Sequence, residues 1–226
     1  MDKKEFTQRY GVLGLTVDTV IFTVDQEGLK VLLVKRAKDP FKDQWTLPGG
    51  FLERGERLLG AAERVLKNKA GVKNVYLEQL YTFDKKGRDP RGDVMTVAYF
   101  ALAPLDDLKL LVKTGEDTQL FSLDKLPNLG FDHKEIIDYA RMRLQFKLEY
   151  TNVVFSLLPK FFTLSQLQGV YEAIFGKGFD KRNFLKKYLS LGFIKPTDKL
   201  FTGGRQRPAK LYEFTSRRPT SLKKFF

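Results

Sequence analysis

One stretch in the first third of the chain constrains the fold more than any other. It begins with the turn Leu47-Pro48-Gly49-Gly50 and continues into residues 58–70, where apolar side chains recur at helical spacing until Gly71 stops the run. A short strand, a glycine turn and a helix in this order have the outline of a motif for phosphate chemistry. The stretch therefore predicts a domain in which a helix follows and packs beside a sheet.

Apolar runs and turn-forming segments alternate on both sides of this stretch. The pattern predicts strands over residues 12–24, 29–34, 45–47, 75–83, 94–102 and 119–123. A further helix is predicted from residue 132 to about residue 149, because Asp132 and Glu135 have the spacing of a capping box. These elements together predict an α+β domain with one internal helix and one closing helix.

Two more helices are predicted in the last third of the chain. Thr163 and Gln166 have capping-box spacing and open a helix over residues 164–175. Asp180 is a good N-cap for a second helix over residues 181–191, and a glycine follows it as a stop signal.

A β-ribbon is predicted after these helices. Residues 193–195 and 211–214 read as two short strands around a loop rich in Gly and Arg. Helix, tight turn, helix and β-ribbon is the order of a winged helix-turn-helix. We therefore predict two domains, residues 1–150 and residues 151–226.

The positive charge of the chain is concentrated in the second of these domains. Residues 151–226 contain 15 Lys and Arg against 4 Asp and Glu, a net charge of +11, out of +13 for the whole chain. A solvated basic tail and a nucleic-acid-binding module are the two interpretations of such a bias. The distribution of charge within the predicted second helix decides between them.

The predicted helix over residues 181–191 has a cationic face opposite an apolar one. Phe184, Leu185, Tyr188, Leu189 and Leu191 fill the apolar arc, and no acidic residue interrupts the cationic face. Arg and Lys suit phosphates and guanine edges, and Asn suits adenine, so this face favours binding in the major groove of double-stranded DNA. The predicted DNA-binding residues are Lys181, Arg182, Asn183, Lys186 and Lys187 on the helix and Arg205 and Arg207 on the wing loop.

The frame of the opening stretch resembles the Nudix box. That pattern runs G-x5-E-x7-R-E-U-x-E-E-x-G-U, where U is aliphatic, and Gly50, Glu56, Arg64, Leu66 and Gly71-Val72 stand at the matching positions. The resemblance implies a Nudix fold, an α/β/α sandwich, for the first domain.

The three glutamates that follow the arginine of the box are replaced by Val65, Asn68 and Lys69. In the family these carboxylates hold magnesium, a hard cation that prefers anionic oxygen ligands. On a helix the three positions share one face, which here offers no carboxylate. We therefore expect a domain without catalytic residues, metal or cofactor.

The order of a degenerate Nudix domain and a basic winged helix resembles the Nudix-related transcriptional regulators of bacteria. Residues 131–133, 158–164 and 180–184 look like linker and recognition-helix segments of that family. The resemblance implies a homodimer that represses transcription and senses a metabolite in the Nudix pocket. The predicted effector-binding residues are Arg36, Trp45, Glu53, Glu56, Arg88 and Asp89, and His133 is expected to be a helix cap or a surface residue.

The identity of the effector stays open between two classes. Loss of the metal ligands favours a sugar or sugar derivative over the alternative, ADP-ribose or a related nucleotide that metal-bridged phosphates would hold. Two rival functions remain: a divergent Nudix hydrolase acting on ADP-ribose, and an inactive module that acts through a protein partner.

The chain has no cysteine, no signal peptide at its N-terminus and no long apolar run, so we expect a cytoplasmic protein without a membrane span.

Overall fold

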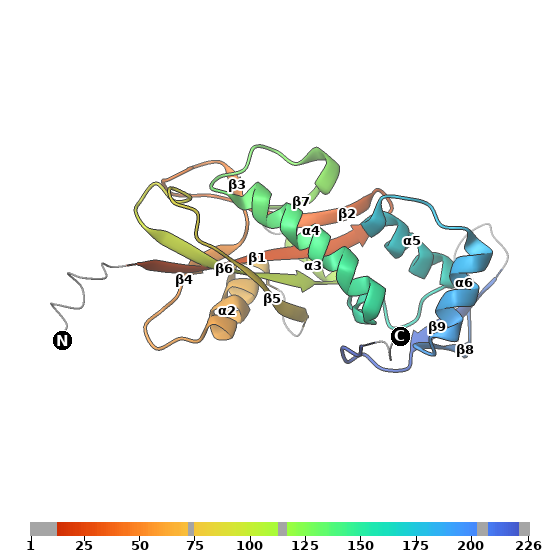
Figure 1. Ribbon diagram of the computed structural model, residues 1–226. Helices are drawn as coiled ribbons and strands as arrows, with labels where there is room; N and C mark the ends of the chain where they lie inside the picture. Colours follow the sequence, from red (N-terminus) through yellow and green to blue (C-terminus); the bar gives the residue numbers. More distant parts are fainter. Residues whose placement is uncertain (1–12, 72–74, 113–116, 203–207, 222–226) are drawn as a thin grey trace.

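The computed structural model describes residues 13–71, 75–112, 117–202 and 208–221. A mixed sheet forms the centre of the first domain (Figure 1), with strand order β3-β2-β1-β6-β5, β4 beside β1 and β7 beside β2. β1 and β6 pair in parallel, and the other neighbours are antiparallel. The strands are β1 (Gly14–Asp25), β2 (Gly28–Lys35), β3 (Trp45–Thr46), β4 (Gly49–Phe51), β5 (Tyr76–Phe83), β6 (Val94–Leu102) and β7 (Thr118–Ser122).

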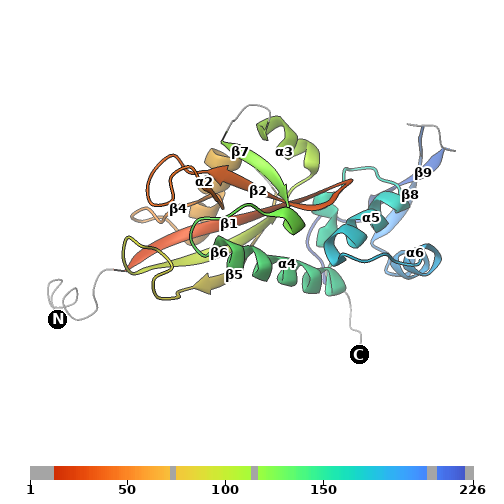
Figure 2. The same cartoon turned by 90° about the horizontal axis from the view of Figure 1, so that it is seen from above.

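Helices cover both faces of this sheet, as Figure 2 shows from above. The helices α2 (Leu58–Ala70) and α3 (Leu105–Val112) lie on one face, and α4 (His133–Tyr150) lies on the other. The central strands are apolar at successive positions because alternate side chains of a strand point to opposite faces, and here both faces are buried. In β1, Val17 and Ile21 belong to clusters with α2 and α3, whereas Phe22 belongs to the cluster with α4. The predicted α/β/α sandwich is confirmed.

The helix of the opening stretch has the limits that its sequence predicts. α2 ends at Gly71, whose φ of 54° lies in the left-handed region that favours glycine. Lys67 and Lys69 stand in its last turn, where the helix dipole favours positive charge.

The second domain is a winged helix. It contains α5 (Leu164–Phe175), α6 (Lys181–Ser190) and a ribbon of β8 (Ile194–Phe201) and β9 (Ala209–Phe214). The predicted capping box is confirmed, because Gln166 and Thr163 exchange hydrogen bonds at the start of α5. The predicted N-cap of α6 is confirmed as well: Asp180 accepts from the backbone N–H of Asn183 at 2.8 Å.

The two domains share one continuous core. Leu144 and Leu148 of α4 belong to the same buried cluster as Leu167 and Ile174 of α5. The Gln145 side chain donates to the Ile174 carbonyl at 2.8 Å across the junction. α4 therefore reaches from the first domain directly onto the second (Figure 1).

Residues 216–221 return to this junction at the end of the chain. Arg217 donates to the carbonyls of Phe155, Leu158 and Pro159, and Asn152 exchanges hydrogen bonds with Thr220. These bonds satisfy carbonyls around the 3-10 turn Val153–Leu157, where a buried unpaired group would be costly.

Some local predictions were wrong. The expected capping box at the start of α4 does not form: Asp132 is the N-cap residue but its side chain makes no capping bond, because it binds Arg88 instead. Leu189 was assigned to the apolar arc of α6, yet it is 42% exposed. The helix α3, the strand β4 and the short 3-10 turn Leu123–Lys125 were not predicted. No helix in the described part of the chain is long and apolar enough to cross a membrane.

Candidate ligand cavity and nucleic-acid interface

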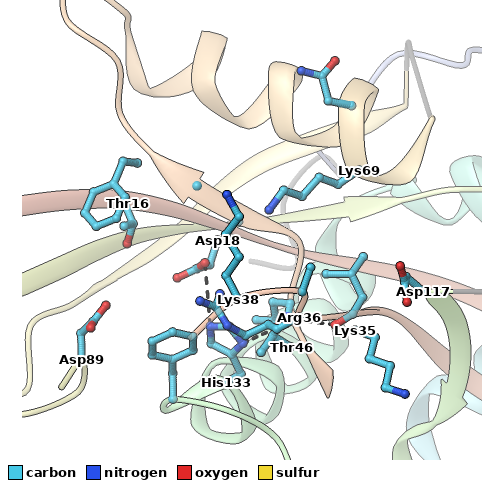
Figure 3. A pocket seen from close by; sticks show the side chains of 18 of the residues that line it. Thr16, Asp18, Lys35, Arg36, Lys38, Thr46, Lys69, Asp89, Asp117 and His133 are labelled. Atoms are coloured by element: carbon cyan, nitrogen blue, oxygen red, sulfur yellow. Dashed lines mark hydrogen bonds and ion pairs between the residues drawn. The ribbon is translucent and has the colours of Figure 1, made fainter. Parts of the chain in front are cut away.

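A cavity of about 540 Å³ opens where the sheet meets the start of α4 (Figure 3). Its walls come from β1 and β2, the β2–β3 loop, the end of α2, the β5–β6 loop and the first residues of α4. This volume lies in the range of small-molecule sites. Its lining contains six cationic side chains and three carboxylates. The cations are Lys35, Arg36, Lys38, Lys69, Arg88 and Arg91, and the carboxylates are Asp18, Asp89 and Asp117.

Arg88 organises the floor of the cavity. Its guanidinium donates two hydrogen bonds to the Asp132 carboxylate, at 2.8 and 2.7 Å, and lies 3.5 Å from Asp18. All three side chains are more than nine-tenths buried. Gly49, which faces Asp18 across the β1–β4 pair, has no room for a side chain, since a Cβ there would overlap the Asp18 carboxylate. The network fixes the start of α4 against β1.

His133 is the next member of this floor and is buried, so the prediction of a cap or surface residue was wrong. Its Nδ1 accepts the backbone N–H of Leu47 at 2.8 Å, and its Nε2 lies 3.8 Å from Asp18. Burial lowers the pKa of His133 and outweighs the opposing effect of Asp18 and Asp132. The imidazole is therefore neutral and acts as a hydrogen-bond acceptor.

The free energy of unfolding should fall as the pH drops from about 7 to about 5. The unfolded state protonates His133 near its ordinary pKa, while the native state resists protonation, so the unfolded state binds more protons. Urea unfolding at several pH values measures this slope. His133→Asn keeps an acceptor without a titrating group and should flatten the curve; the chain has no other histidine. Equal slopes for both proteins would contradict the assignment.

Aromatic rings form one side of the cavity. The guanidinium of Arg36 lies 4.9 Å from the ring centre of Phe131, and that of Arg91 lies 4.9 Å from the ring centre of Phe51. Phe131 has a φ of 59°, an unfavourable conformation for a residue with a Cβ, and such strain tends to occur at functional sites. The rings and cations together suit a ligand with both a flat group and a negative charge.

Three of the six predicted effector residues line this cavity: Arg36, Arg88 and Asp89. Asp89 is buried and accepts a forked pair of bonds from Arg91 at 2.9 and 2.6 Å, which lowers the pKa of Asp89. Asp89 thus positions Arg91 at the rim.

The placement of Trp45, Glu53 and Glu56 at the cavity was wrong, because none of them lines it. The indole of Trp45 packs edge-on against Phe121, with ring centres 4.9 Å apart. Glu56 accepts two hydrogen bonds from Arg64, both at 2.7 Å, and this lowers its pKa to about 2. Glu53 lies 3.5 Å from the same guanidinium.

The positions of the lost box glutamates lie at the cavity or under it. Val65 is buried in α2, while Asn68 and Lys69 line the cavity wall. The Lys69 ammonium points into the cavity in Figure 3. Its pKa is lowered by desolvation and by the nearby charge of Arg36. In the described part of the chain no cluster of three His, Cys, Asp or Glu could hold a metal ion.

The cavity residues that the sequence prediction missed include Asp18, Lys38, Arg91 and Phe131. Asp18 could have been identified from the sequence, because a carboxylate in the middle of an apolar strand must find a partner when it is buried. The others lie in loops, where no periodicity marks them.

The cationic face of α6 is at the surface of the second domain. Lys181, Arg182, Asn183, Lys186 and Lys187 are all exposed, whereas Tyr188 on the opposite side is buried. Among the residues that the structure describes, Arg182 and Lys186 have no ion-pair partner. The predicted wing residues Arg205 and Arg207 lie outside the described residues.

Comparisons with known proteins match both parts of the chain. The model of the NUDIX domain matches residues 13–140, and the model of the NrtR DNA-binding winged helix domain matches residues 154–214. The "ADPR responsive transcriptional repressor NtrR" of Acinetobacter baylyi is 39% identical over 204 residues, which are 88% of this chain and 81% of that protein.

Two solved structures of NrtR from Shewanella oneidensis are similar as well. The complex of that protein with a 27mer DNA has a TM-score of 0.81 and 36% identity, and covers 89% of this chain and 93% of the other. The cocrystal structure of its NUDIX domain with ADP ribose has a TM-score of 0.53 and 36% identity, and covers 64% of this chain and 99% of the other.

Proposed function

The chain belongs to the family of Nudix-domain regulators with an NrtR-type winged helix, and we propose that it is a transcriptional repressor that ADP-ribose controls. The observation that carries this proposal is the combination of an exposed cationic helix with a cationic cavity, joined through a shared core. The similarity to an ADPR responsive repressor over most of both chains supports it.

The DNA-binding surface that we propose is the exposed face of α6 with the wing. Arg182 and Lys186 stand four residues apart, one turn along the helix, and Asn183 lies beside them. Such a row reaches base edges and phosphates when a helix lies in the major groove. The similarity to a protein solved with a 27mer DNA supports this use of the domain.

The effector that we propose is ADP-ribose, and the prediction of a sugar finds no support. A neutral sugar would leave the excess of positive charge in the cavity unbalanced, whereas a diphosphate supplies a counter-charge. The aromatic rings of Phe131 and Phe51 suit the adenine base. A related NUDIX domain solved with ADP ribose supports the choice.

The connection between cavity and DNA-binding surface that we propose is α4. Its first residues lie at the cavity floor and its last turns pack against α5. A helix of 18 residues is about 27 Å long, which is the distance that separates the two ends. A second cavity, of about 670 Å³, separates the end of α4 from α6 and leaves room for the two to shift. Ligand at one end of α4 would thereby favour an arrangement of the winged helix that releases DNA.

The division at residue 150 and the homodimer stay part of the proposal. Met142, Phe146 and Tyr150 form a stripe on α4 at four-residue spacing, and they are 38%, 50% and 41% exposed. Such a stripe is a candidate for burial between two copies. Two copies would present two recognition helices to a two-fold operator.

Operator release tests the proposed function. Fragmented genomic DNA bound by the protein at moderate salt identifies the operator, and fluorescence anisotropy then measures its affinity. We expect ADP-ribose to weaken operator binding by a factor of about 5–150, the usual range of allosteric coupling. Ribose and ribose 5-phosphate serve as controls and should have no effect.

Two results would contradict this proposal. Absence of any specific DNA site would favour a module that acts through a protein partner. Release of AMP from ADP-ribose with magnesium or manganese would favour the rival hydrolase, which a chromatographic assay of the same mixtures detects.

A further inference from the structure

The metal that the Nudix family uses has no place in this cavity. Of the three positions that carry its ligands, Val65 is buried and apolar, Asn68 is neutral and Lys69 is cationic. The carboxylates of Asp18 and Asp89, which line the cavity, bind Arg88 and Arg91, and those of Glu53 and Glu56 in the box bind Arg64. The residues therefore do not fit a magnesium ion, which needs anionic oxygens.

The space beside Asp18 is bordered by positive charge in place of such ligands. In Figure 3 the ammonium groups of Lys38, from the β2–β3 loop, and Lys69, from α2, point toward one another there, and Arg36 lies below them. No described carboxylate forms an ion pair with these three side chains. These cations repel one another, Asp18 offsets only part of that repulsion, and a bound anion would relieve the rest.

The pKa of Lys69 agrees with an excess of positive charge in this space. Its pKa is lowered by desolvation, with Arg36 as a further cause, while Asp18 opposes the shift. A dianionic group between these cations would raise the pKa of Lys69 and so reverse the lowering that Arg36 causes. The cavity thus has a built-in preference for a ligand with concentrated negative charge.

We propose that Lys69 and Lys38, together with Arg36, replace the divalent metal and hold the diphosphate of the effector without any metal ion. This inference rests on the proposed function, since it assumes an ADP-ribose-class ligand. Charge-assisted hydrogen bonds from ammonium and guanidinium groups to phosphate oxygens supply the binding free energy. The ligand stays intact, because ammonium and guanidinium groups, unlike a divalent metal, do not activate a water molecule to attack the diphosphate.

Calorimetric titration with ADP-ribose tests the inference, in excess EDTA and again with magnesium. The wild-type protein should bind equally well in both. Lys69→Glu should bind about 10- to 100-fold more weakly in EDTA, since a charge-assisted bond becomes a repulsion, and magnesium should restore part of the loss. Lys69→Arg should stay close to wild type, which separates the charge from a structural role.

Lys67→Glu is the matched control. It makes the same change of charge on an exposed position of the same helix turn, but Lys67 does not line the cavity. Its affinity should equal that of the wild type under both conditions.

The outcomes separate this inference from the proposed function. Binding of ADP-ribose by the wild type only with magnesium would overturn the inference and leave the proposed effector standing. Undiminished binding by Lys69→Glu in EDTA would overturn it too. Absence of ADP-ribose binding under every condition would overturn the proposed effector and the inference together.

Discussion

Reversing two charges on α6, with Arg182→Glu and Lys186→Glu combined, should weaken operator binding by at least about 100-fold. Both side chains are exposed on the face opposite the buried Tyr188. Each contact with a phosphate contributes about 0.9 to the steepness of the plot of log affinity against log salt. The two substitutions should therefore make that plot less steep by about two. Fluorescence anisotropy over a salt series measures the affinity and the slope.

The control for this variant is Lys85→Glu with Lys86→Glu. The pair makes the same change of net charge at exposed positions of the β5–β6 loop, at the end of the molecule away from α6 (Figure 1). It should reduce affinity only slightly. Equal losses from the two double variants would show that net charge, not the α6 face, governs binding, and would contradict the assignment.

Arg88→Met should lower the free energy of unfolding by about 3–5 kcal/mol. The substitution keeps the apolar stem and removes the charge, which leaves the carboxylates of Asp132 and Asp18 buried without their cation. A loss of this size is a large part of the stability of an ordinary domain. Urea unfolding followed by circular dichroism measures it.

Lys134→Met is the control for the loss of an ion pair. Lys134 and Asp138 form a pair at 2.6 Å on the outer face of α4, with side chains 61% and 58% exposed. Solvent screens such a pair, so its loss should cost less than about 1 kcal/mol. Similar values for Arg88→Met and Lys134→Met would contradict the structural role that we assign to the buried network.

Local chemistry allowed much of the fold to be predicted. The limits of α2 follow from apolar spacing and a terminal glycine, and the start of α5 follows from a capping box with Gln166. In both cases the residues that decide the structure lie within one helical turn of the end that they define. The same holds for Asp180 at the start of α6.

Long-range partners explain the predictions that were wrong. Asp132 has the sequence of a capping residue, yet Arg88, 44 positions earlier, binds its carboxylate. Glu56 and Arg64 are eight positions apart and join only because the turn folds back onto α2. Local spacing cannot reveal which of several acceptors a buried arginine selects.

The candidate site shows the same limit. The substitution at Lys69 was visible as a lost metal ligand, which led us to expect a ligand with less charge. The structure places Lys38 across from it, and two converging ammonium groups favour more charge. Lys38 lies in a loop without periodicity, so only the folded chain brings the two together.

The most direct test of the account is the affinity of ADP-ribose with and without bound operator, measured by titration in EDTA. Linkage requires that operator DNA weaken ADP-ribose binding by the same factor by which ADP-ribose weakens operator binding. The account predicts two equal factors, each well above one. Identical ADP-ribose affinities for the free and the operator-bound protein would contradict it.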